Sequence, residues 1–346
     1  MDATSHALSR VRGKVLRLHP RRLRSPASST FATLGVTLKR YRDFNSYLRE
    51  IFGERVQKIS LDAGLGCPNR DGTISNTGCI FCDSRGSGTG ALINDGLSID
   101  EQIIRAQSYM QKRYKAKKYI AYFQSFTNTY APVPRLKALY DQALAHKHMV
   151  GLSVATRPDC LNEDVLKLVS SYKKKHLVWI EYGLQSSHDM TLKRINRGHD
   201  AACFEQSVRM TDEYGINICA HVILGLPGED RKIMLQTARF LAKLPVHGVK
   251  IHLLYVVKGT PLSALYEKGE FSCLEQGEYV ALVVDFLELL PPDMVVQRLT
   301  GDPVKSELTA PSWALEKSEN LRLINESLER RDTWQGRLYR NSTAGK

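Results

Sequence analysis

Six short apolar runs alternate with amphipathic segments, and this alternation restricts the fold more than any other feature of the chain. The runs are KISLDAG (58–64), YIAYFQS (119–125), GLSVATRP (151–158), LVWIEYGLQ (177–185), NICAHVILG (217–225) and VKIHLLYVV (249–257). The segments between them carry apolar residues at helical spacing, at 98–114, 134–145, 162–175, 188–214 and 231–244. Strands that alternate with helices predict a parallel sheet with right-handed crossovers.

The connection after the first run distinguishes between two kinds of parallel α/β fold. A dinucleotide-binding sheet has a glycine-rich phosphate loop at this point, and none follows residues 58–64. The runs are nearly continuous in apolar residues, as expected for strands covered on both faces. We therefore predict an α/β fold, a partial (β/α)6 barrel over residues 41–270. A helical and strand extension at 271–336, with a helix at 276–290, would follow it.

Polar residues and glycines follow every run, where the carboxyl ends of the strands would meet. They are Asp62 and Gly64; Gln124, Thr127 and Asn128; Thr156, Arg157 and Asp159; Glu181, Gly183 and Gln185; GLPGE (225–229); and KGTP (258–261). The chemistry of βα barrels takes place at this face. We expect the active site there.

Three cysteines stand in GCPNRDGTISNTGCIFC (66–82), at Cys67, Cys79 and Cys82. A structural zinc site usually needs four ligands, and the remaining cysteines, Cys160, Cys203, Cys219 and Cys273, form no second CxxC pair. Cys203 and Cys219 fall in a predicted helix and strand, where cysteine is commonly a small buried apolar residue. Three thiolates suit a [4Fe–4S] cluster with one iron left open. A zinc-binding RNA protein that adds a histidine to the three cysteines is the alternative.

The formal charge of +13 comes from the two ends of the chain. Residues 1–42 contribute +9 and residues 330–346 contribute +4, so the rest is neutral. Residues 1–40, rich in Arg, Ser, Ala and Thr, predict a transit peptide, with the plastid ahead of the mitochondrion. A disordered basic arm on a cytoplasmic protein is the alternative, and 337–346 forms a basic tail. No apolar run is long enough to span a membrane, so we expect no membrane partner.

Several strings resemble motifs of the radical S-adenosylmethionine (SAM) superfamily, and more narrowly of its YhcC/YtqA-like group. They are SLDAGLGCPNRDG, FTNTYAPV, TRPDCL, GLQSSHDMTLKRINRGHD, HVILGLPGE, KIHLLYVVKGTPL and QRLTGD, spread over residues 41–336. This group is related to the elongator catalytic subunit and to oxygen-independent coproporphyrinogen oxidase. The eleven residues between Cys67 and Cys79 depart from the superfamily's common three-residue gap but resemble the group's own pattern.

The resemblance implies that Cys67, Cys79 and Cys82 bind a [4Fe–4S] cluster, with SAM on its fourth iron. It implies SAM contacts for Gln124, Glu181, Gln185, Arg197, His221 and Gly225. Gln185 and Arg197 would approach the SAM carboxylate, Glu181 the amino group or ribose, and Gly225 the cofactor through its backbone. Two alternatives stay open: Arg197 as a charge at a helix C-terminus, and His221 as a hydrogen-bonded barrel-core residue. FQSFTNT replaces the superfamily's GGE-type motif, which leaves the contacts to the SAM amino group open.

The resemblance also implies a reaction. A reduced cluster, supplied with electrons by a reductase or ferredoxin, would cleave SAM to a 5′-deoxyadenosyl radical that takes hydrogen from a substrate. The group suggests tRNA as the partner, with a carboxymethylaminomethyl side chain on the wobble uridine converted to aminomethyl. A small molecule or tetrapyrrole is the alternative substrate. Residues placed where substrate should bind are Asn128, Tyr130, Arg157, Asp159, His252 and Lys258.

Overall fold

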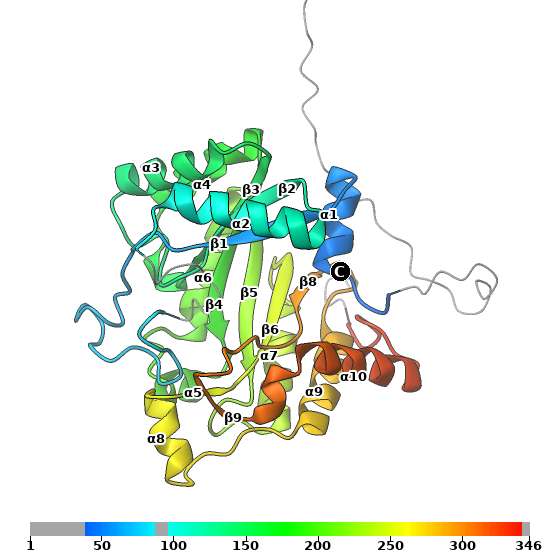
Figure 1. Cartoon of the computed structure of the whole chain (residues 1–346). Coiled ribbons are helices and arrows are strands. Elements are labelled where there is room, and N and C mark those ends of the chain that lie inside the picture. Colours follow the sequence, from blue (N-terminus) through cyan, green and yellow to red (C-terminus); the bar gives the residue numbers. More distant parts are fainter. Residues whose placement is uncertain (1–38, 87–95, 341–346) are drawn as a thin grey trace, which may run out of the picture. The chain divides into compact units, whose positions relative to one another are not determined.

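The sheet has seven parallel strands that follow one another in chain order and curl into a half-barrel (Figure 1). The computed structural model describes residues 39–86 and 96–340. The strands are β1 (Val56–Leu61), β2 (Lys118–Phe123), β3 (Met149–Thr156), β4 (Leu177–Gln185), β5 (Asn217–Leu224), β6 (Gly248–Leu253) and β8 (Val295–Arg298). The predicted α/β partial barrel is confirmed.

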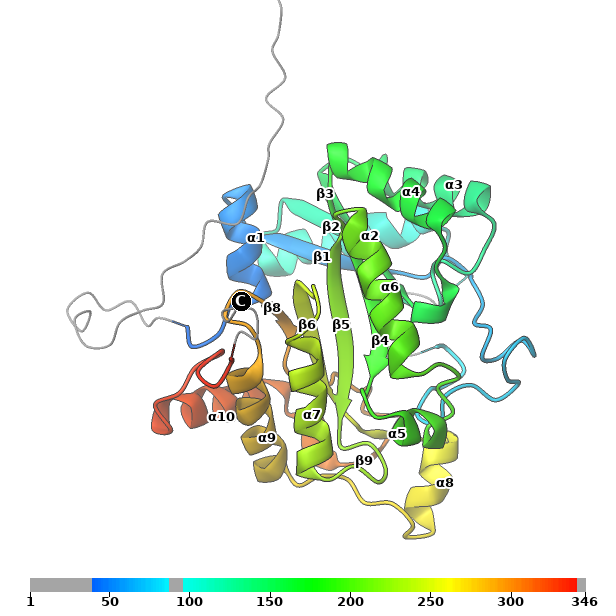
Figure 2. The same ribbon diagram turned by 180° about the vertical axis from the view of Figure 1, so that it is seen from behind.

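Helices connect the strands and cover the outer face of the sheet, as the view from behind shows for α6 and α7 (Figure 2). They are α2 (Ile99–Tyr114), α3 (Val133–Leu144), α4 (Glu163–Ser171), α5 (Asp189–Arg194), α6 (Ala201–Glu213) and α7 (Arg231–Leu241). Side chains cap several of their N-termini, and Ser98 with Glu101 forms a capping box on α2. The capped helices α2, α4, α6 and α7 begin at or next to their caps Ser98, Asn162, Asp200 and Asp230, whereas α3 begins after Pro132 without a side-chain cap.

The outer face of the sheet is apolar at alternating positions. Ile59, Phe123, Val154, Ile180 and Val222 are all fully buried in one core with the covering helices. Successive side chains of a strand point to opposite faces, so the residues between these positions face the inside of the half-barrel. The alternating apolar positions of each strand, which pack against the helices, thus determine which residues face the inside of the half-barrel.

The predicted count of six strands is wrong by one, because β8 joins the sheet beside β6. Its pairs with β6 include Gly248 with Val295 and Val249 with Val296. β8 is only four residues long and follows α9 (Gln276–Leu289), so it falls within the predicted extension. The predicted run 249–257 is also split: β6 ends at Leu253, and β7 (Val256–Val257) pairs antiparallel with β9 (Leu308–Ala310).

Helix α1 (Phe44–Phe52), which the sequence analysis did not predict, packs at the amino ends of the strands. Phe44 and Tyr47 meet the ring of Trp179 edge-on, with centroid distances of 6.1 Å and 5.8 Å. α1 thus covers the amino-terminal end of the half-barrel with apolar side chains. The opposite end stays available for a site.

The remaining helices belong to the second half of the chain. α8 (Pro261–Glu267) follows β7, and α10 (Lys317–Arg330) packs against α9. The predicted boundary at residue 270 stays a prediction. The predicted transit peptide, 1–40, lies almost wholly outside the described residues. No helix in the described part of the chain is long and apolar enough to cross a membrane.

Candidate active site

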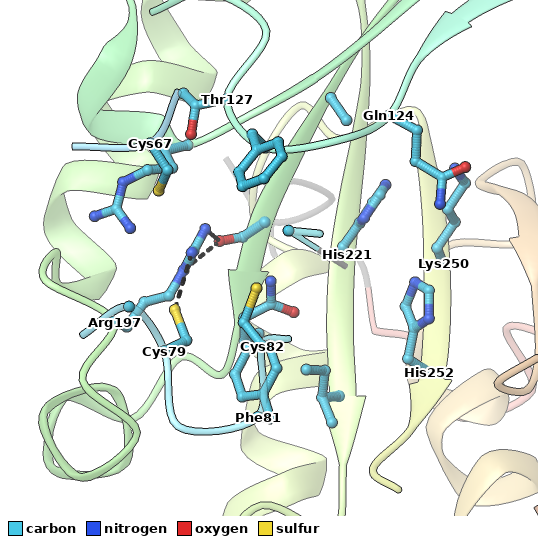
Figure 3. A pocket seen from close by; sticks show the side chains of 18 of the residues that line it. Cys67, Cys79, Phe81, Cys82, Gln124, Thr127, Arg197, His221, Lys250 and His252 are labelled. Atoms are coloured by element: carbon cyan, nitrogen blue, oxygen red, sulfur yellow. Dashed lines mark hydrogen bonds between the residues drawn. The ribbon is translucent and has the colours of Figure 1, made fainter. Parts of the chain in front are cut away.

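One pocket opens inside the half-barrel and collects most of the predicted site residues (Figure 3). Its lining includes Cys67, Cys79, Cys82, Gln124, Glu181, Gln185, Arg197 and His221. Figure 3 shows the three cysteines and Arg197 on one side and Gln124, Lys250 and His252 on the other. We call Cys67, Cys79, Cys82 and Arg197 the cysteine wall. The lysine wall consists of the pocket-lining residues Glu181, His221, Lys250, His252 and Arg298, together with Lys58, which does not line the pocket but contacts Glu181.

The loop between β1 and α2 folds back on itself and brings the cysteines together. The backbone N–H of Arg70 donates to the Cys67 carbonyl at 2.8 Å, and that of Cys82 donates to the Cys79 carbonyl at 3.0 Å. Gly78 has a φ of 74° and packs against the Arg70 side chain, which a Cβ would meet at 2.9 Å. A glycine is required there on both counts.

Cys79 receives two side-chain contacts at its sulfur. Asn69 Nδ2 lies 3.6 Å from Cys79 Sγ, and Arg197 Nη1 lies 3.5 Å from it. Cys79 is only 6% exposed. Both contacts come from N–H donors, so the Cys79 sulfur is held in place at the pocket.

The spacing of the three thiols suits a cluster better than a single metal ion. Among the described residues, the only three metal-ligating side chains with ligand atoms within 4.8 Å of one another are Glu181, Cys219 and His221. At least two of the three cysteine sulfurs are therefore more than 4.8 Å apart. Two sulfurs on one tetrahedral zinc lie about 3.8 Å apart, given Zn–S bonds of about 2.3 Å. The donor set, three thiols around one pocket with no fourth, fits a multi-iron cluster with an open position.

Arg197 is held against the end of β4. Its Nε and Nη2 donate to the Gly183 carbonyl at 3.1 Å and 2.6 Å. A Cβ on Gly183 would lie 2.6 Å from Arg197 Nη2, so only glycine leaves room for the guanidinium. Gln185, two residues on, has a φ of 75° and lines the same pocket. A non-glycine residue at positive φ is a strained feature often found at functional sites.

Arg157 is a second buried guanidinium beside the cysteines. Its Nε and Nη2 donate to the two Asp159 oxygens at 2.8 Å and 2.7 Å. Burial acts to raise the pKa of Asp159, but Arg157 outweighs it and lowers that pKa below its usual range. Arg157 Nη1 is buried without a hydrogen-bond partner among the described residues and belongs to a pocket-lining side chain. A donor of this kind suits an anionic or oxygen-rich ligand.

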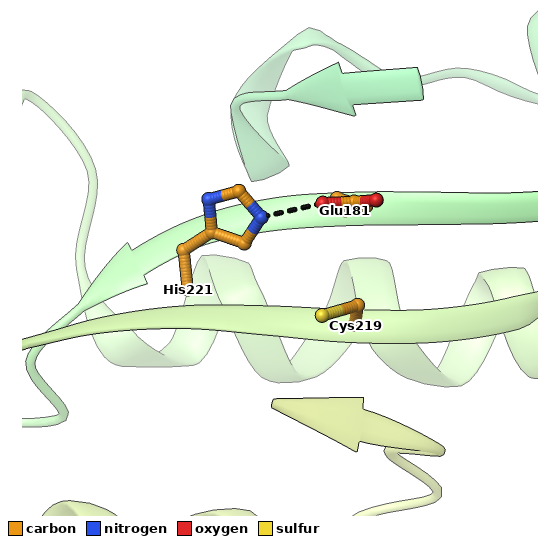
Figure 4. Close-up of side chains that lie close together, drawn as sticks. All are labelled: Glu181, Cys219 and His221. Carbon is orange, nitrogen blue, oxygen red and sulfur yellow. Dashed lines mark hydrogen bonds and ion pairs between the residues drawn. The ribbon is translucent and has the colours of Figure 1, made fainter. Parts of the chain in front are cut away.

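The lysine wall is centred on the fully buried carboxylate of Glu181. Glu181 Oε1 contacts Lys58 Nζ and Ser153 Oγ, and Oε2 contacts Lys250 Nζ. His221 Nε2 lies 2.8 Å from Oε2. Figure 4 marks this contact between His221 and Glu181 with a dashed line. His221 is thus hydrogen-bonded in the barrel interior while it also lines the pocket.

Burial and charge shift the pKa values of this wall. Burial acts to raise the pKa of Glu181, but the Lys250 and Lys58 ammonium groups outweigh it and hold that pKa well below its usual value. Burial lowers the pKa of Lys250 to about 7, even though Glu181 acts in the opposite direction. Burial also lowers the pKa of His221 to about 4. His221 is therefore neutral at pH 7.

Gln124 and Gly225 differ in their positions. Gln124 lines the pocket, and its Oε1 accepts a hydrogen bond from Ser60 Oγ at 2.8 Å. Gly225 is not among the residues that line the pocket, and its backbone N–H contacts Met234 Sδ at 3.1 Å. The proposed contact of Gly225 with a cofactor stays a prediction.

The predicted substrate positions are divided between two places. Arg157 and His252 line the main pocket, whereas Tyr130 and Asp159 line a second pocket with Cys160. The Asn128 amide donates to the Ala155 carbonyl at 3.0 Å, and Lys258 Nζ donates to the Ser306 carbonyl at 2.9 Å. Asn128 and Lys258 line neither pocket.

The sequence analysis missed Lys58, Tyr122, Lys250 and Arg298. Lys58 and Lys250 lie inside runs that were taken as apolar strands. The available signal was their two-residue spacing from other polar groups, Lys58 from Ser60 and Lys250 from His252, which puts them on the inner face.

Comparison with known proteins agrees with this geometry. The family model of the Radical SAM superfamily matches residues 66–241, and that of the Radical_SAM C-terminal domain matches residues 246–330. The Bacillus subtilis protein YtqA is 45% identical over 306 residues, covering 88% of this chain and 94% of YtqA. Escherichia coli YhcC is 38% identical over 271 residues, covering 78% of this chain and 86% of YhcC.

Two more distant similarities involve elongator-type proteins. A tRNA uridine(34) acetyltransferase of Dehalococcoides mccartyi is 27% identical over 162 residues, covering 46% of this chain and 34% of that protein. The solved structure of archaeal Elp3 from Methanocaldococcus infernus superposes with a TM-score of 0.59 at 17% identity, covering 81% of this chain and 64% of that chain. At this identity the superposition shows a shared fold.

Proposed function

The chain belongs to the radical SAM superfamily, and from that premise we propose that this radical SAM enzyme modifies the wobble uridine of tRNA. The reaction would convert a carboxymethylaminomethyl side chain to aminomethyl. SAM would serve as the two-electron oxidant of the carboxymethyl CH2 group, and water would hydrolyse the resulting imine, which breaks the N–CH2 bond and releases the two-carbon fragment as glyoxylate. The observation that carries the enzyme class is the convergence of Cys67, Cys79 and Cys82 on one pocket inside the half-barrel. The membership implies a [4Fe–4S] cluster and SAM, together with an external electron donor such as a ferredoxin or reductase.

We assign cluster binding to the three cysteines and SAM contacts to residues around them. When bound, the reduced cluster and SAM supply a 5′-deoxyadenosyl radical that can take a hydrogen atom from a C–H bond. Arg197 and Gln185 would bind the SAM carboxylate, since a guanidinium suits a carboxylate geometrically. Gln124 and His221 line the same pocket and would bind the amino group or ribose. Gly225 would contribute only through backbone displaced from its present position.

Glu181 has a different role in this proposal from a direct SAM ligand. Both of its oxygens already have two partners each. It therefore positions Lys58, Lys250 and His221 in the pocket wall. A contact between Glu181 and the SAM amino group would require one of these partners to move.

The tRNA substrate is supported by similarity to the tRNA uridine(34) acetyltransferase over 46% of this chain. The C-terminal segment adds an arginine–aromatic pair: the Arg337 guanidinium lies 5.7 Å from the centroid of the Trp334 ring, and Trp334 is 41% exposed. Such groups can stack on unpaired bases. We further propose that residues 1–40 direct the protein to the plastid, which fusion of this segment to a fluorescent protein would test.

The reaction can be tested with the full chain, reconstituted with iron and sulfide without oxygen. Reduced protein and SAM are incubated with tRNA that carries carboxymethylaminomethyluridine. The tRNA is then digested, and its nucleosides are separated by chromatography and identified by mass spectrometry. We expect that nucleoside to decline while aminomethyluridine accumulates. SAM cleavage with unchanged tRNA would contradict the tRNA assignment and favour a small-molecule substrate, with which the neutral charge of residues 43–329 is compatible.

A further inference from the structure

The lysine wall carries more positive than negative charge. Its cationic side chains are Lys58, Lys250 and Arg298, and its one carboxylate, Glu181, pairs with Lys58 and Lys250. Lys250 and Arg298 line the pocket, whereas Lys58 does not. The strand register puts Lys250 and Arg298 side by side, because Lys250 of β6 pairs with Arg298 of β8 and, on its other side, with His221 of β5. Figure 3 shows Lys250 and His252 across the pocket from the cysteines. The pocket is thus short of negative charge at the wall away from the cysteines.

Glu181 does not neutralise Arg298, because both of its oxygens already contact other groups. Its Oε1 is taken by Lys58 and Ser153, and its Oε2 by Lys250 and His221. Within residues 39–86 and 96–340, Arg298 makes no ion pair, although its side chain lines the pocket. A half-buried guanidinium without a carboxylate is poorly compensated.

His252 adds a second unsatisfied group at the same wall. Its Nε2 atom is buried and, among the described residues, has no hydrogen-bond partner. Its ring stacks at a tilt on His221 with a centroid distance of 5.5 Å, which fixes it in the pocket lining. Buried polar atoms in native proteins nearly always have a partner, so this nitrogen suits a ligand atom.

Lys250 also has unused hydrogen-bonding capacity. Its ammonium group carries three donors, of which Glu181 takes one, and it lies 4.0 Å from the centroid of the Tyr122 ring. A second anion beside it would favour the protonated form.

We propose that Lys250, His252 and Arg298 form a recognition site for a carboxylate group of the substrate. Arg298 supplies the planar fork that pairs with a carboxylate, His252 Nε2 supplies one further donor, and Lys250 supplies charge. This inference rests on the proposed function, in which the substrate carries a carboxymethyl group. That carboxylate would occupy the lysine wall, and the adjoining C–H bonds would lie between the two walls.

SAM also carries a carboxylate, so the test must separate two sources. The SAM carboxylate is expected at the cysteine wall, where Arg197 lies 3.5 Å from Cys79 Sγ. The two walls face each other across the pocket (Figure 3). A variant of the lysine wall should therefore change the KM for the substrate and leave the KM for SAM.

The experiment uses full-length reconstituted enzyme and two synthetic anticodon stem-loop RNAs. One carries carboxymethylaminomethyluridine at the wobble position, and the other carries its uncharged carboxamide. Arg298→Gln removes the charge, Arg298→Lys keeps the charge without the fork, and Arg322→Gln is the control because Arg322 lies exposed on α10. Binding of both RNAs, turnover of the first, and KM for SAM are measured; iron content and thermal unfolding check each variant's integrity.

We expect wild-type enzyme to bind the carboxylate RNA at least tenfold more tightly than the carboxamide. R298Q should abolish this preference, R298K should reduce it, and R322Q should keep it. Equal binding of the two RNAs by wild type, or an unchanged preference in R298Q, would overturn the inference even if turnover is normal. A raised KM for SAM in R298Q would also overturn it, by assigning the site to the cofactor. Carboxylate-selective binding lost in R298Q, without turnover, would instead support the site and refute the proposed reaction.

Discussion

The cysteine wall and the lysine wall of the pocket are built from different parts of the fold. The cysteines come from a long loop after β1, where backbone hydrogen bonds set their positions. The lysine wall comes from the inner faces of β1, β4, β5, β6 and β8. A loop can present three ligands to a cofactor, whereas neighbouring strands hold charged groups at fixed register. This difference fits the proposed division of roles, in which the cysteine wall holds the cofactors and the lysine wall recognises the substrate.

The largest expected effect comes from removing a thiol of the cysteine wall. Cys67→Ser, Cys79→Ser or Cys82→Ser should reduce SAM cleavage to background and lower the iron content, because each removes one of three cluster ligands. Iron analysis and chromatography of 5′-deoxyadenosine measure both. Cys203→Ser, on the outer helix α6, should retain iron and activity. A C79S variant with full iron content and full SAM cleavage would contradict the assignment of Cys79 as a cluster ligand.

Removing the central carboxylate of the lysine wall should instead affect stability. Glu181→Gln leaves Lys58 and Lys250 without their buried partner, so we expect a loss of about 3–5 kcal/mol in the free energy of unfolding. Denaturant titration of the cluster-free protein measures it. The control Glu319→Gln, at an exposed ion pair on α10, should leave the stability essentially unchanged, because solvent screens that pair.

Wild type and E181Q also test how stability depends on pH, and the direction of the expected change is defined. The pKa of Glu181 is lowered in the folded chain, so its ionised form stabilises folding above the usual value of 4.5. That stabilisation is lost as the pH falls below 4.5. The difference in unfolding free energy between wild type and E181Q should therefore shrink in acid. A difference that grows in acid would contradict the assignment of charge to Glu181.

Arg197→Lys tests the cysteine wall without removing a ligand. Lysine keeps the charge but cannot span the Gly183 carbonyl and Cys79 Sγ as the guanidinium does. We expect about a tenfold fall in SAM cleavage, since each lost charge-assisted hydrogen bond is worth about 1.5 kcal/mol or more. The electron paramagnetic resonance spectrum of the reduced cluster should shift with it. Arg194→Lys, at the end of α5 and three residues before Arg197, should leave the spectrum unchanged, because Arg194 binds the Pro227 carbonyl.

A pair of glycine substitutions gives a smaller effect. In Gly183→Ala the new Cβ would lie 2.6 Å from Arg197 Nη2 and 2.8 Å from Gln185 Nε2, so we expect about 1–3 kcal/mol of destabilisation. Gly277→Ala, in α9, meets nothing within 4 Å and should stabilise by up to about 1 kcal/mol. Thermal unfolding compares the two. Equal effects would show that the guanidinium does not need the space at Gly183.

The smallest expected effect concerns the proton on Lys250. Burial lowers the pKa of Lys250 to about 7, so its ammonium charge declines as the pH rises through 7. The KM for a carboxylate substrate should therefore rise several-fold between pH 6.5 and 8.5, while binding of the carboxamide changes little. A pH profile of KM with both RNAs checks this. A KM that falls over the same range would contradict a role for the Lys250 charge.

The cysteine wall could be predicted from sequence because its residues stand in motifs. Six strands were located to within three residues at the start and, except for the last, at the end. The lysine wall could not be predicted, because Lys58 and Lys250 stand more than 180 residues apart and meet Glu181 only through strand register. The place of β8 in the sheet was missed for the same reason: pairing with β6 is a property of the folded chain.

Helix α1 shows a signal that was present but not used. Asp43 accepts a hydrogen bond from the Ser46 N–H at its start, and Gly53 ends it in the left-handed conformation. Both are ordinary helix-boundary residues. The packing of α1 against Trp179 cannot be predicted from these local signals, because it depends on the tertiary fold. Local signals thus define the element, and the fold defines what it covers.

The central claim is that the cysteine wall holds a cluster that cleaves SAM. The most direct measurement is chromatography of 5′-deoxyadenosine from the full chain, purified without oxygen, reconstituted, reduced with dithionite and given SAM, with and without tRNA. We predict an iron–sulfur protein that releases 5′-deoxyadenosine only when Cys67, Cys79 and Cys82 are all present, and faster with tRNA. A colourless protein that binds zinc and leaves SAM intact would contradict the account.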